Sequence, residues 1–210
     1  MMQAIGQKKY GVDMTDIFLE LKEKLKNKID YRVLDRIIEY YNSSFFYDRD
    51  VFCSNLLWNN FDKSISNILI VGGNIPIIYL DKFKNYNLTF IDNNPALFYV
   101  KDYIKEKYNC DVIYDNPITC DLSNLIEKQD LIIYPETETL VPFDLLRYNH
   151  NNKIVFCSNF LRYPFKINNN LAYSEEDLID ICGITNIILK GNEFLNINTR
   201  KVYYVMGHAS

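Results

Sequence analysis

The stretch TNIILKGNEFLNINTRKVYYVMG, residues 185–207, decides the fold. It holds two strand-like runs joined only by a short loop that contains Gly191 and Asn192, too short for a helix. Two consecutive strands without a crossover helix between them must pair antiparallel. The sequence therefore predicts a β-hairpin at this end of the chain.

Upstream of the hairpin, from residue 67 onward, short apolar runs alternate with helix-length segments. Each run is rich in β-favouring residues and is bounded by Gly, Asn, Asp or Pro, a pattern typical of buried parallel strands. The segments between the runs suit crossover helices, and PALFYVKDYIKEKY is the clearest of them. The five runs are NILIVGG, NLTFIDNN, CDVIYDN, DLIIYP and KIVFCSN.

The apolar spacing in residues 14 to about 61 predicts helices, not strands. In DIFLELKEKLKNKI the apolar residues recur at helical spacing, and Thr15 or Asp16 would serve as the N-cap. The stretches YRVLDRIIEYY and DVFCSNLLWNNF are the second and third candidates. Because no linker follows them, we expect residues 1–64 to form an N-terminal helical extension or cap on the main domain, residues 65–210.

Composition argues against several classes of protein. Hydrophobic residues make up 48% of the 210 residues, enough for a substantial core. The formal net charge is -4, whereas nucleic-acid binders usually carry a basic surplus, so no nucleic-acid partner is expected. The five cysteines form no CxxC pair, and no metal site is predicted. Without a membrane-length apolar run or a signal-peptide core, a cytoplasmic protein is expected.

The first chemical motif is ILIVGGNIPIIYL, residues 68–80, in which the first predicted strand runs into Gly72 and Gly73. Without a Cβ atom, glycines allow a sharp turn and a close approach of the backbone to a ligand. Asn74 can adopt a left-handed conformation, which continues the turn. The motif predicts a nucleotide-binding loop, and the alternative is that the two glycines form only a tight turn.

The second motif, LTFIDNN, places Asp92 at the C-terminal tip of the second predicted strand, 19 residues beyond Gly73. An acidic residue at this position accepts hydrogen bonds from the ribose hydroxyls of an adenosine ligand, and Asn93 follows it directly. Because such an acid serves NAD as well as other adenosine cofactors, Asp92 predicts nucleoside binding and not the reaction. The alternative role for Asp92 is a helix-capping carboxylate ahead of Pro95.

Five βα units closed by a hairpin, together with these two motifs, resemble the class I S-adenosylmethionine-dependent methyltransferase superfamily. The resemblance covers residues 67–206. It implies a Rossmann-like three-layer α/β sandwich, with a mostly parallel seven-stranded sheet that ends in a C-terminal antiparallel hairpin, and S-adenosyl-L-methionine as the cofactor. The chain departs from the family's glycine-x-glycine-x-glycine loop, which is reduced here to Gly72-Gly73-Asn74, and Pro76 stands where a later glycine is common.

The resemblance implies roles at the end of the third strand. In this family a polar or acidic residue there meets the adenine amino group, and Asp115 or Asp121 would fill that place. Asp121 has an alternative role as the N-cap of the helix LSNLIEK.

The fourth strand of this family ends at the cofactor's reactive sulfonium. Tyr134, Pro135 and Glu136 form that tip here, so Tyr134 and Pro135 are expected to contact the cofactor. Glu136 is the candidate catalytic residue, either as a base or by holding a cationic or amine substrate. An exposed loop glutamate is the alternative for Glu136 and the preferred interpretation for Glu138.

The expected function is methyl transfer from S-adenosylmethionine to a small or medium-sized substrate of unknown identity. GGNIPI, residues 72–77, also somewhat resembles the Gly-x-Gly-Pro-Leu-Pro-Leu loop of nicotianamine synthase-like enzymes, which transfer the aminobutyrate arm of the same cofactor. A third hypothesis is a non-catalytic module that binds an adenosine ligand. A nicotinamide dehydrogenase comes last because of the closing hairpin. The sequence predicts neither the acceptor nor the oligomeric state.

Overall fold

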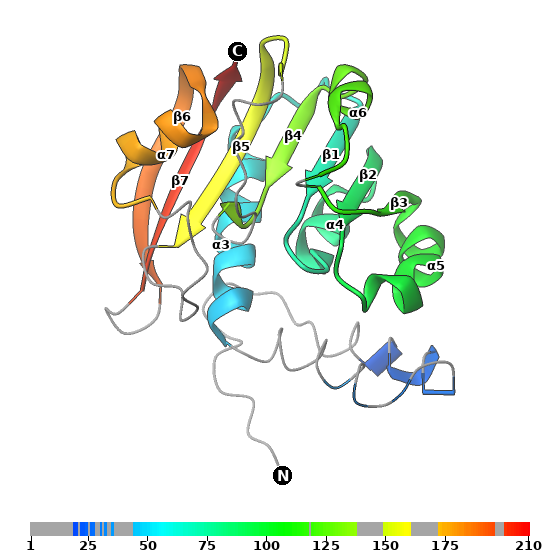
Figure 1. The fold of residues 1–210 in the computed structure, drawn as a ribbon. Coiled ribbons are helices and arrows are strands. Elements are labelled where there is room, and N and C mark those ends of the chain that lie inside the picture. Colours follow the sequence, from blue (N-terminus) through cyan, green and yellow to red (C-terminus); the bar gives the residue numbers. More distant parts are fainter. Residues whose placement is uncertain are drawn as a thin grey trace.

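Each apolar run predicted from the sequence forms a strand of one seven-stranded sheet (Figure 1). The computed structural model describes residues 19–20, 22–24, 26–27, 30, 32, 35, 44–117, 119–137, 149–160, 172–195 and 200–210. The strands are β1 Asn67–Val71, β2 Asn87–Asp92, β3 Cys110–Tyr114, β4 Leu131–Tyr134, β5 Lys153–Phe160, β6 Ile184–Leu195 and β7 Arg200–Ala209. The helices are α3 Ser44–Asn60, α4 Ile77–Phe83, α5 Leu97–Tyr108, α6 Ser123–Glu127 and α7 Glu175–Cys182.

The strands lie in the order β3-β2-β1-β4-β5-β7-β6. β1 to β5 are parallel, and β7 runs antiparallel between β5 and β6. The chain builds outward from β1 to β3 and then returns to the other side of β1 to form β4, so the strand order reverses between β1 and β4. The predicted Rossmann-like α/β sandwich with its closing antiparallel hairpin is confirmed.

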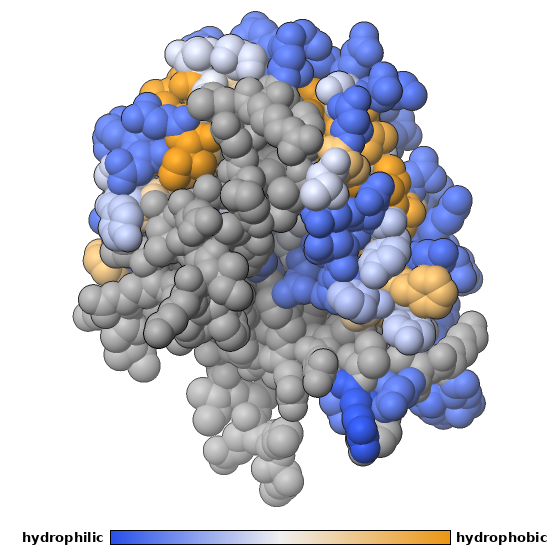
Figure 2. All heavy atoms as spheres, in the orientation of Figure 1, coloured by the Kyte–Doolittle hydropathy of each residue, from blue (hydrophilic) through white to orange (hydrophobic). Residues whose placement is uncertain are grey.

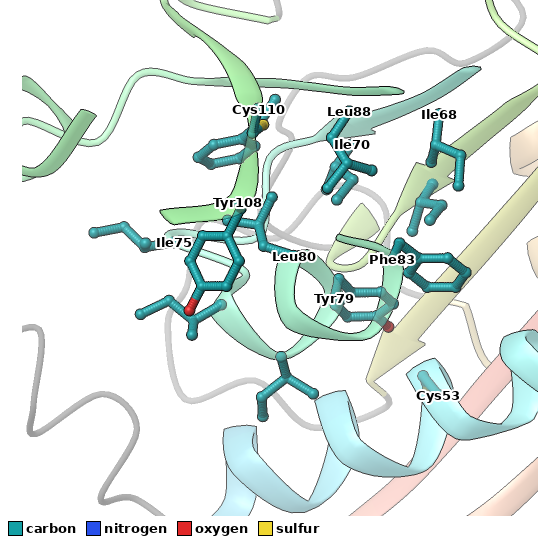
Figure 3. Packing of buried hydrophobic residues seen from close by; sticks show 14 of the residues in the cluster. Cys53, Ile68, Ile70, Ile75, Tyr79, Leu80, Phe83, Leu88, Tyr108 and Cys110 are labelled. Atoms are coloured by element: carbon teal, nitrogen blue, oxygen red, sulfur yellow. The ribbon is translucent and has the colours of Figure 1, made fainter. Parts of the chain in front are cut away.

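Both faces of the central strands are buried, because alternate residues enter two separate cores. In β1, Ile68 and Ile70 join a cluster with side chains of α3, α4 and α5. Figure 3 shows part of this cluster, in which Tyr79, Leu80 and Phe83 of α4 pack against the sheet. Leu69 and Val71 of β1 join the cluster beneath α6 and α7. Helices therefore cover the sheet on both sides, as Figure 1 shows.

Gly191 and Asn192 lie within β6, so their predicted place in the hairpin loop is wrong. They pair with Tyr204 and Tyr203 of β7, and β6 continues to Leu195. A Cβ atom on Gly191 would lie 2.5 Å from the Tyr204 hydroxyl oxygen. Glycine is therefore needed here for the close approach of a side chain on the neighbouring strand, not for a turn.

Alanine at Gly207 is expected to destabilise the fold more than alanine at Gly191. A Cβ atom on Gly207 would clash with the carbonyl oxygen of Asn186, which is backbone of β6 and cannot move away alone. At Gly191 the obstacle is a tyrosine ring that can rotate. We expect Gly207→Ala to lower the free energy of unfolding by about 2–3 kcal/mol and Gly191→Ala by about 1 kcal/mol. Urea unfolding of both variants checks this, and equal effects would contradict the close backbone pairing of β6 with β7 at Gly207.

α3 confirms the third helix predicted near the N-terminus. The first two predicted helices, with the N-cap candidates Thr15 and Asp16, fall almost entirely outside the described residues. The described positions in that part include contacts with α5: Lys107 pairs with Glu20, and Nζ of Lys24 lies 3.9 Å from Oε1 of Glu106. They place Glu20 and Lys24 against α5, while the division of the chain at residue 64 stays a prediction.

The described part of the chain has a largely hydrophilic outer rim on the face shown in Figure 2. None of its described helices has the length and apolar character needed to cross a membrane. All five cysteines are free thiols, and four of them are buried. Within the described residues, no group of three or more His, Cys, Asp or Glu side chains is arranged to hold a metal ion.

Candidate nucleoside-binding and active site

The reversal of strand order brings the glycine loop after β1 against the tip of β4. A Cβ atom on Gly73 would lie 3.0 Å from Cγ of Pro135. Two of the segments predicted to form the site are therefore packed directly against each other. In open α/β sheets the carboxyl ends of the strands at such a reversal are the usual place for a ligand.

The glycine loop consists of three successive residues in the left-handed region. Their φ angles are 73° for Gly72, 89° for Gly73 and 67° for Asn74. Glycine and asparagine tolerate this region better than other residues, which explains why the shortened loop still turns. The Gly72 amide donates to the carbonyl of Ile91 at 2.9 Å, which ties the loop to the end of β2.

Asp92 ends β2 and is only 7% exposed. Its Oδ1 accepts a hydrogen bond from the Asn94 amide at 2.5 Å, and the backbone amides of Asn74 and Asn93 also act on the carboxylate. Burial, and to a smaller extent the charge of Glu136, raises the pKa of Asp92 to about 7 against these hydrogen bonds. Asp92 thus holds the turn at Asn93 and Asn94 and faces the glycine loop, whereas α5 begins after Ala96 without a side-chain cap, so the contact expected of a helix-capping Asp92 is not formed.

Two exposed aromatic rings lie near the end of β3, next to Asp92 in the sheet, and sequence reasoning missed both. Tyr114 pairs in register with Asp92 across β2 and β3, and it is 47% exposed. Phe98, at the start of α5, is 59% exposed, and its ring centroid lies 6.5 Å from that of Tyr114. The available signal was the pair Phe98-Tyr99, two aromatic residues that lie off the apolar face of the helix formed by Leu97, Val100 and Ile104. Exposed rings beside a buried carboxylate suit a flat, partly apolar ligand.

The two aspartates considered at the third strand end differ in their surroundings. Asp115 is exposed, and its amide donates to the backbone carbonyl of Asp92 at 3.2 Å. Asp121 accepts from the Ser123 amide at 2.9 Å, at the start of α6. Asp121 therefore has the helix-capping contact of its alternative role, while Asp115 lies next to the end of β2.

Tyr134 is a core side chain in this structure. It is fully buried in the cluster beneath α6 and α7, and its hydroxyl makes a hydrogen bond with Nε2 of His150 at 3.2 Å. Pro135, the next residue, packs on Gly73, and its carbonyl accepts from Oγ of Ser158 at 2.5 Å. Of these two candidates, Pro135 is the one that contacts the glycine loop.

Glu136 is 1% exposed and forms an ion pair with Arg49 of α3. The alternative of an exposed loop glutamate is therefore wrong for Glu136. Arg49 also pairs with its neighbour Asp50, with 2.8 Å between Nε and Oδ1, and both residues are fully buried. Burial raises the pKa of Asp50 to about 6. Glu138 lies outside the described residues.

Sequence reasoning also missed Arg49 and Asp50. The available signal was the run Asp48-Arg49-Asp50, three successive charged residues at the start of a stretch whose other face is strongly apolar. Three neighbouring helical residues point in widely different directions, so their common burial means that this part of α3 is enclosed on several sides. The ion pair with Glu136 joins α3 to the tip of β4.

No model of a known protein family matches this sequence, and no curated protein sequence matches it significantly. Solved structures are similar to it in fold. EvdMO1 has a TM-score of 0.56 at 12% identity, over 77% of this chain and 41% of its own. The S-adenosylmethionine-dependent methyltransferase SibL, in its apo form, has a TM-score of 0.54 at 13% identity, over 80% and 57%.

The N-methyltransferase NodS from Bradyrhizobium japonicum WM9, in complex with S-adenosyl-L-homocysteine, has a TM-score of 0.54 at 12% identity, over 90% of this chain and 97% of its own. The present chain thus spans about half the length of EvdMO1 and SibL. The fold is that of the class I S-adenosylmethionine-dependent methyltransferases, as the sequence led us to expect. At this level of identity the likeness concerns the fold alone.

Proposed function

We propose that this protein binds S-adenosylmethionine and transfers its methyl group to a nucleophile in a small or medium-sized substrate. The observation that carries the proposal is the buried carboxylate of Asp92 facing the left-handed loop Gly72-Gly73-Asn74 at the reversal of strand order. A carboxylate suits the ribose hydroxyls of a nucleoside, and a glycine backbone without Cβ atoms leaves room for the group attached to that ribose.

The residues present fit that cofactor at several points. Asp92 would accept hydrogen bonds from the ribose hydroxyls, with Asn93 beside it. The exposed rings of Phe98 and Tyr114 would cover the adenine, and Asp115 lies where the adenine amino group is expected. When bound, the cofactor supplies a methyl group made electrophilic by a positively charged sulfur.

The contribution of the chain itself is orientation and charge. Glu136 holds a carboxylate at the tip of β4, where it would stabilise a positive centre in a buried environment. In-line methyl transfer needs a nucleophile held at the right distance and direction, which binding groups can provide without a dedicated acid or base. The ion pair with Arg49 holds the Glu136 side chain in place, and a group that orients a substrate needs such a fixed position.

Calorimetric titration with S-adenosylmethionine, S-adenosylhomocysteine and NAD tests the proposal. We expect S-adenosylhomocysteine to bind at least about tenfold more tightly than NAD, a difference of about 1.4 kcal/mol. Tight NAD binding without a response to S-adenosylhomocysteine would contradict it. In turnover, S-adenosylhomocysteine as product indicates methyl transfer, methylthioadenosine indicates aminobutyrate transfer, and binding without any product indicates a non-catalytic module.

Glu136→Gln is expected to lower turnover by about tenfold or more while changing the affinity for S-adenosylhomocysteine by less than about twofold. Glutamine keeps the size of the side chain and one hydrogen bond to Arg49 but removes the negative charge. Glu138→Gln is the matched control, and melting curves of both variants separate folding from activity. Equal and small effects of the two changes would remove Glu136 from the reactive end of the site.

A further inference from the structure

Asn94, in the turn between β2 and α5, ties that turn to the glycine loop. Its Oδ1 accepts a hydrogen bond from the Ala96 amide at 2.9 Å, and its Nδ2 donates to Oδ1 of Asn74. A backbone amide can only donate, so the end of the Asn94 side chain that meets Ala96 is the oxygen. The other end is therefore the NH₂ group, and the oxygen of Asn74 is its acceptor.

The backbones of the same two residues act on the carboxylate of Asp92. The Asn94 amide donates to Oδ1 of Asp92 at 2.5 Å, and the Asn74 amide is a further backbone donor to this carboxylate. Asp92, Asn74 and Asn94 thus form a closed ring of hydrogen bonds. The side-chain hydrogen bond between Asn74 and Asn94 closes this ring and joins the loop after β1 to the turn after β2.

Asn74 depends on such a contact because of its backbone conformation. Its φ angle of 67° lies in the left-handed region, where asparagine is tolerated but is less at ease than glycine. A non-glycine residue keeps such a conformation where surrounding contacts fix it. The hydrogen bond from Asn94, which lies 20 positions further along the chain, is a contact of this kind. It fixes the shortened glycine loop at the residue whose amide acts on Asp92.

We infer that Asn94 is a positioning residue of the nucleoside site, an inference that rests on the proposed binding of S-adenosylmethionine. Its side chain holds Asn74, and the backbone amides of both residues then direct the carboxylate of Asp92 toward the ribose hydroxyls. Loss of the Asn74–Asn94 hydrogen bond frees the loop and removes this direction. The proposed adenine contacts are with Phe98 and Tyr114, so the loss falls on the ribose hydroxyls alone.

The test compares adenosine with 2′,3′-dideoxyadenosine, which lacks both ribose hydroxyls. Calorimetric titration is done at about pH 8.5, where Asp92, with its pKa of about 7, is ionised. We expect the wild type to bind adenosine at least about tenfold more tightly than the dideoxy compound. In Asn74→Gly this ratio should fall to about threefold or less, because the side-chain hydrogen bond is gone. The melting temperature should stay within about 3 °C of the wild type, since glycine adopts the left-handed conformation freely.

A loop contact with a purely structural role would lower both affinities alike and leave their ratio unchanged. Asn109→Gly is the matched control, because Asn109 is also left-handed, with a φ angle of 48°, and follows the last residue of α5. It should leave the ratio unchanged. Asn94→Ala should lower the ratio as Asn74→Gly does. The double variant should lower it no further than Asn94→Ala, because both changes remove the same hydrogen bond.

The outcomes separate this inference from the proposed function. An unchanged ratio in folded Asn74→Gly overturns the inference, and so do equal wild-type affinities for the two nucleosides, while binding of S-adenosylhomocysteine still supports the proposed function. Effects of Asn74→Gly and Asn94→Ala that multiply in the double variant also overturn it, because the two residues would then act independently. Absence of S-adenosylhomocysteine binding overturns the proposed function and, with it, this inference.

Discussion

Arg49→Met is expected to lower the free energy of unfolding by about 3–5 kcal/mol. The substitution keeps much of the side-chain volume but leaves the buried carboxylates of Asp50 and Glu136 without their shared cation. Removing one partner from a buried ion pair costs more than the pair itself contributes, because the remaining charge stays in a medium of low polarity. Urea unfolding followed by circular dichroism measures the effect.

The control is an ion pair of the same kind on the surface. Lys190 lies 2.8 Å from Glu176, but their side chains are 42% and 66% exposed, so Lys190→Met should cost less than about 1 kcal/mol. The double variant Arg49→Met with Glu136→Gln should recover part of the loss, since it removes one of the stranded charges. Comparable small effects of Arg49→Met and Lys190→Met would mean that Arg49, Asp50 and Glu136 are solvated in solution.

The order of the elements was predictable because it depends on local patterns. Apolar runs such as NILIV mark buried strands, and the absence of helix-length sequence between residues 184 and 209 forces an antiparallel pair. The place of Asp92 follows from the same logic, since it directly ends such a run. The position of Glu136 at the tip of β4 was likewise predictable from the strand that precedes it, although its role stays a prediction.

The partner of Glu136 could not be predicted, because Arg49 lies 87 residues away in the sequence. Nothing local distinguishes a buried arginine from the exposed charges usual on a helix; the distinction arises only when α3 meets the tip of β4. The error at Gly191 has the same origin. A glycine next to an asparagine is typical of a turn, and only the Tyr204 ring on the neighbouring strand reveals a different requirement.

Tyr134 illustrates a further limit of position along the chain. Its place at the end of β4 predicts contact with a ligand, but the alternation of side chains in a strand turns it toward α6 and α7, together with Ile132. Pro135 and Glu136 lie beyond the end of β4, so the alternation of side chains in the strand does not determine where theirs point. The end of a strand therefore predicts the place of a candidate site only to within a residue or two, because the pleat decides on which face of the sheet each side chain lies.

Asp92→Asn is expected to stabilise the ligand-free protein at pH 8 and to weaken its binding of S-adenosylhomocysteine. Burial raises the pKa of Asp92 to about 7 in the folded state, against about 3.9 in an unfolded chain. Between these values the folded protein holds a proton that the unfolded chain has lost. The unfolded chain is therefore favoured as the pH rises from about 4 to about 7, and the free energy of unfolding falls by an amount on the order of 4 kcal/mol, with no further loss above about pH 7.

Asparagine keeps an oxygen that can accept from the Asn94 amide but cannot ionise, so this part of the pH dependence should disappear. Asp50, with its pKa also raised, still titrates in both proteins, and the difference between wild type and variant isolates Asp92. Melting curves from pH 5 to pH 8.5 measure the stability, and calorimetry measures the binding, which should weaken by about 1.5–3 kcal/mol at pH 8. Higher stability together with weaker binding is expected when a buried carboxylate destabilises the fold but contributes to ligand binding. If affinity is unchanged and the melting temperature falls, Asp92 is a helix-capping residue, and the nucleoside site must be sought elsewhere along the carboxyl ends of the strands.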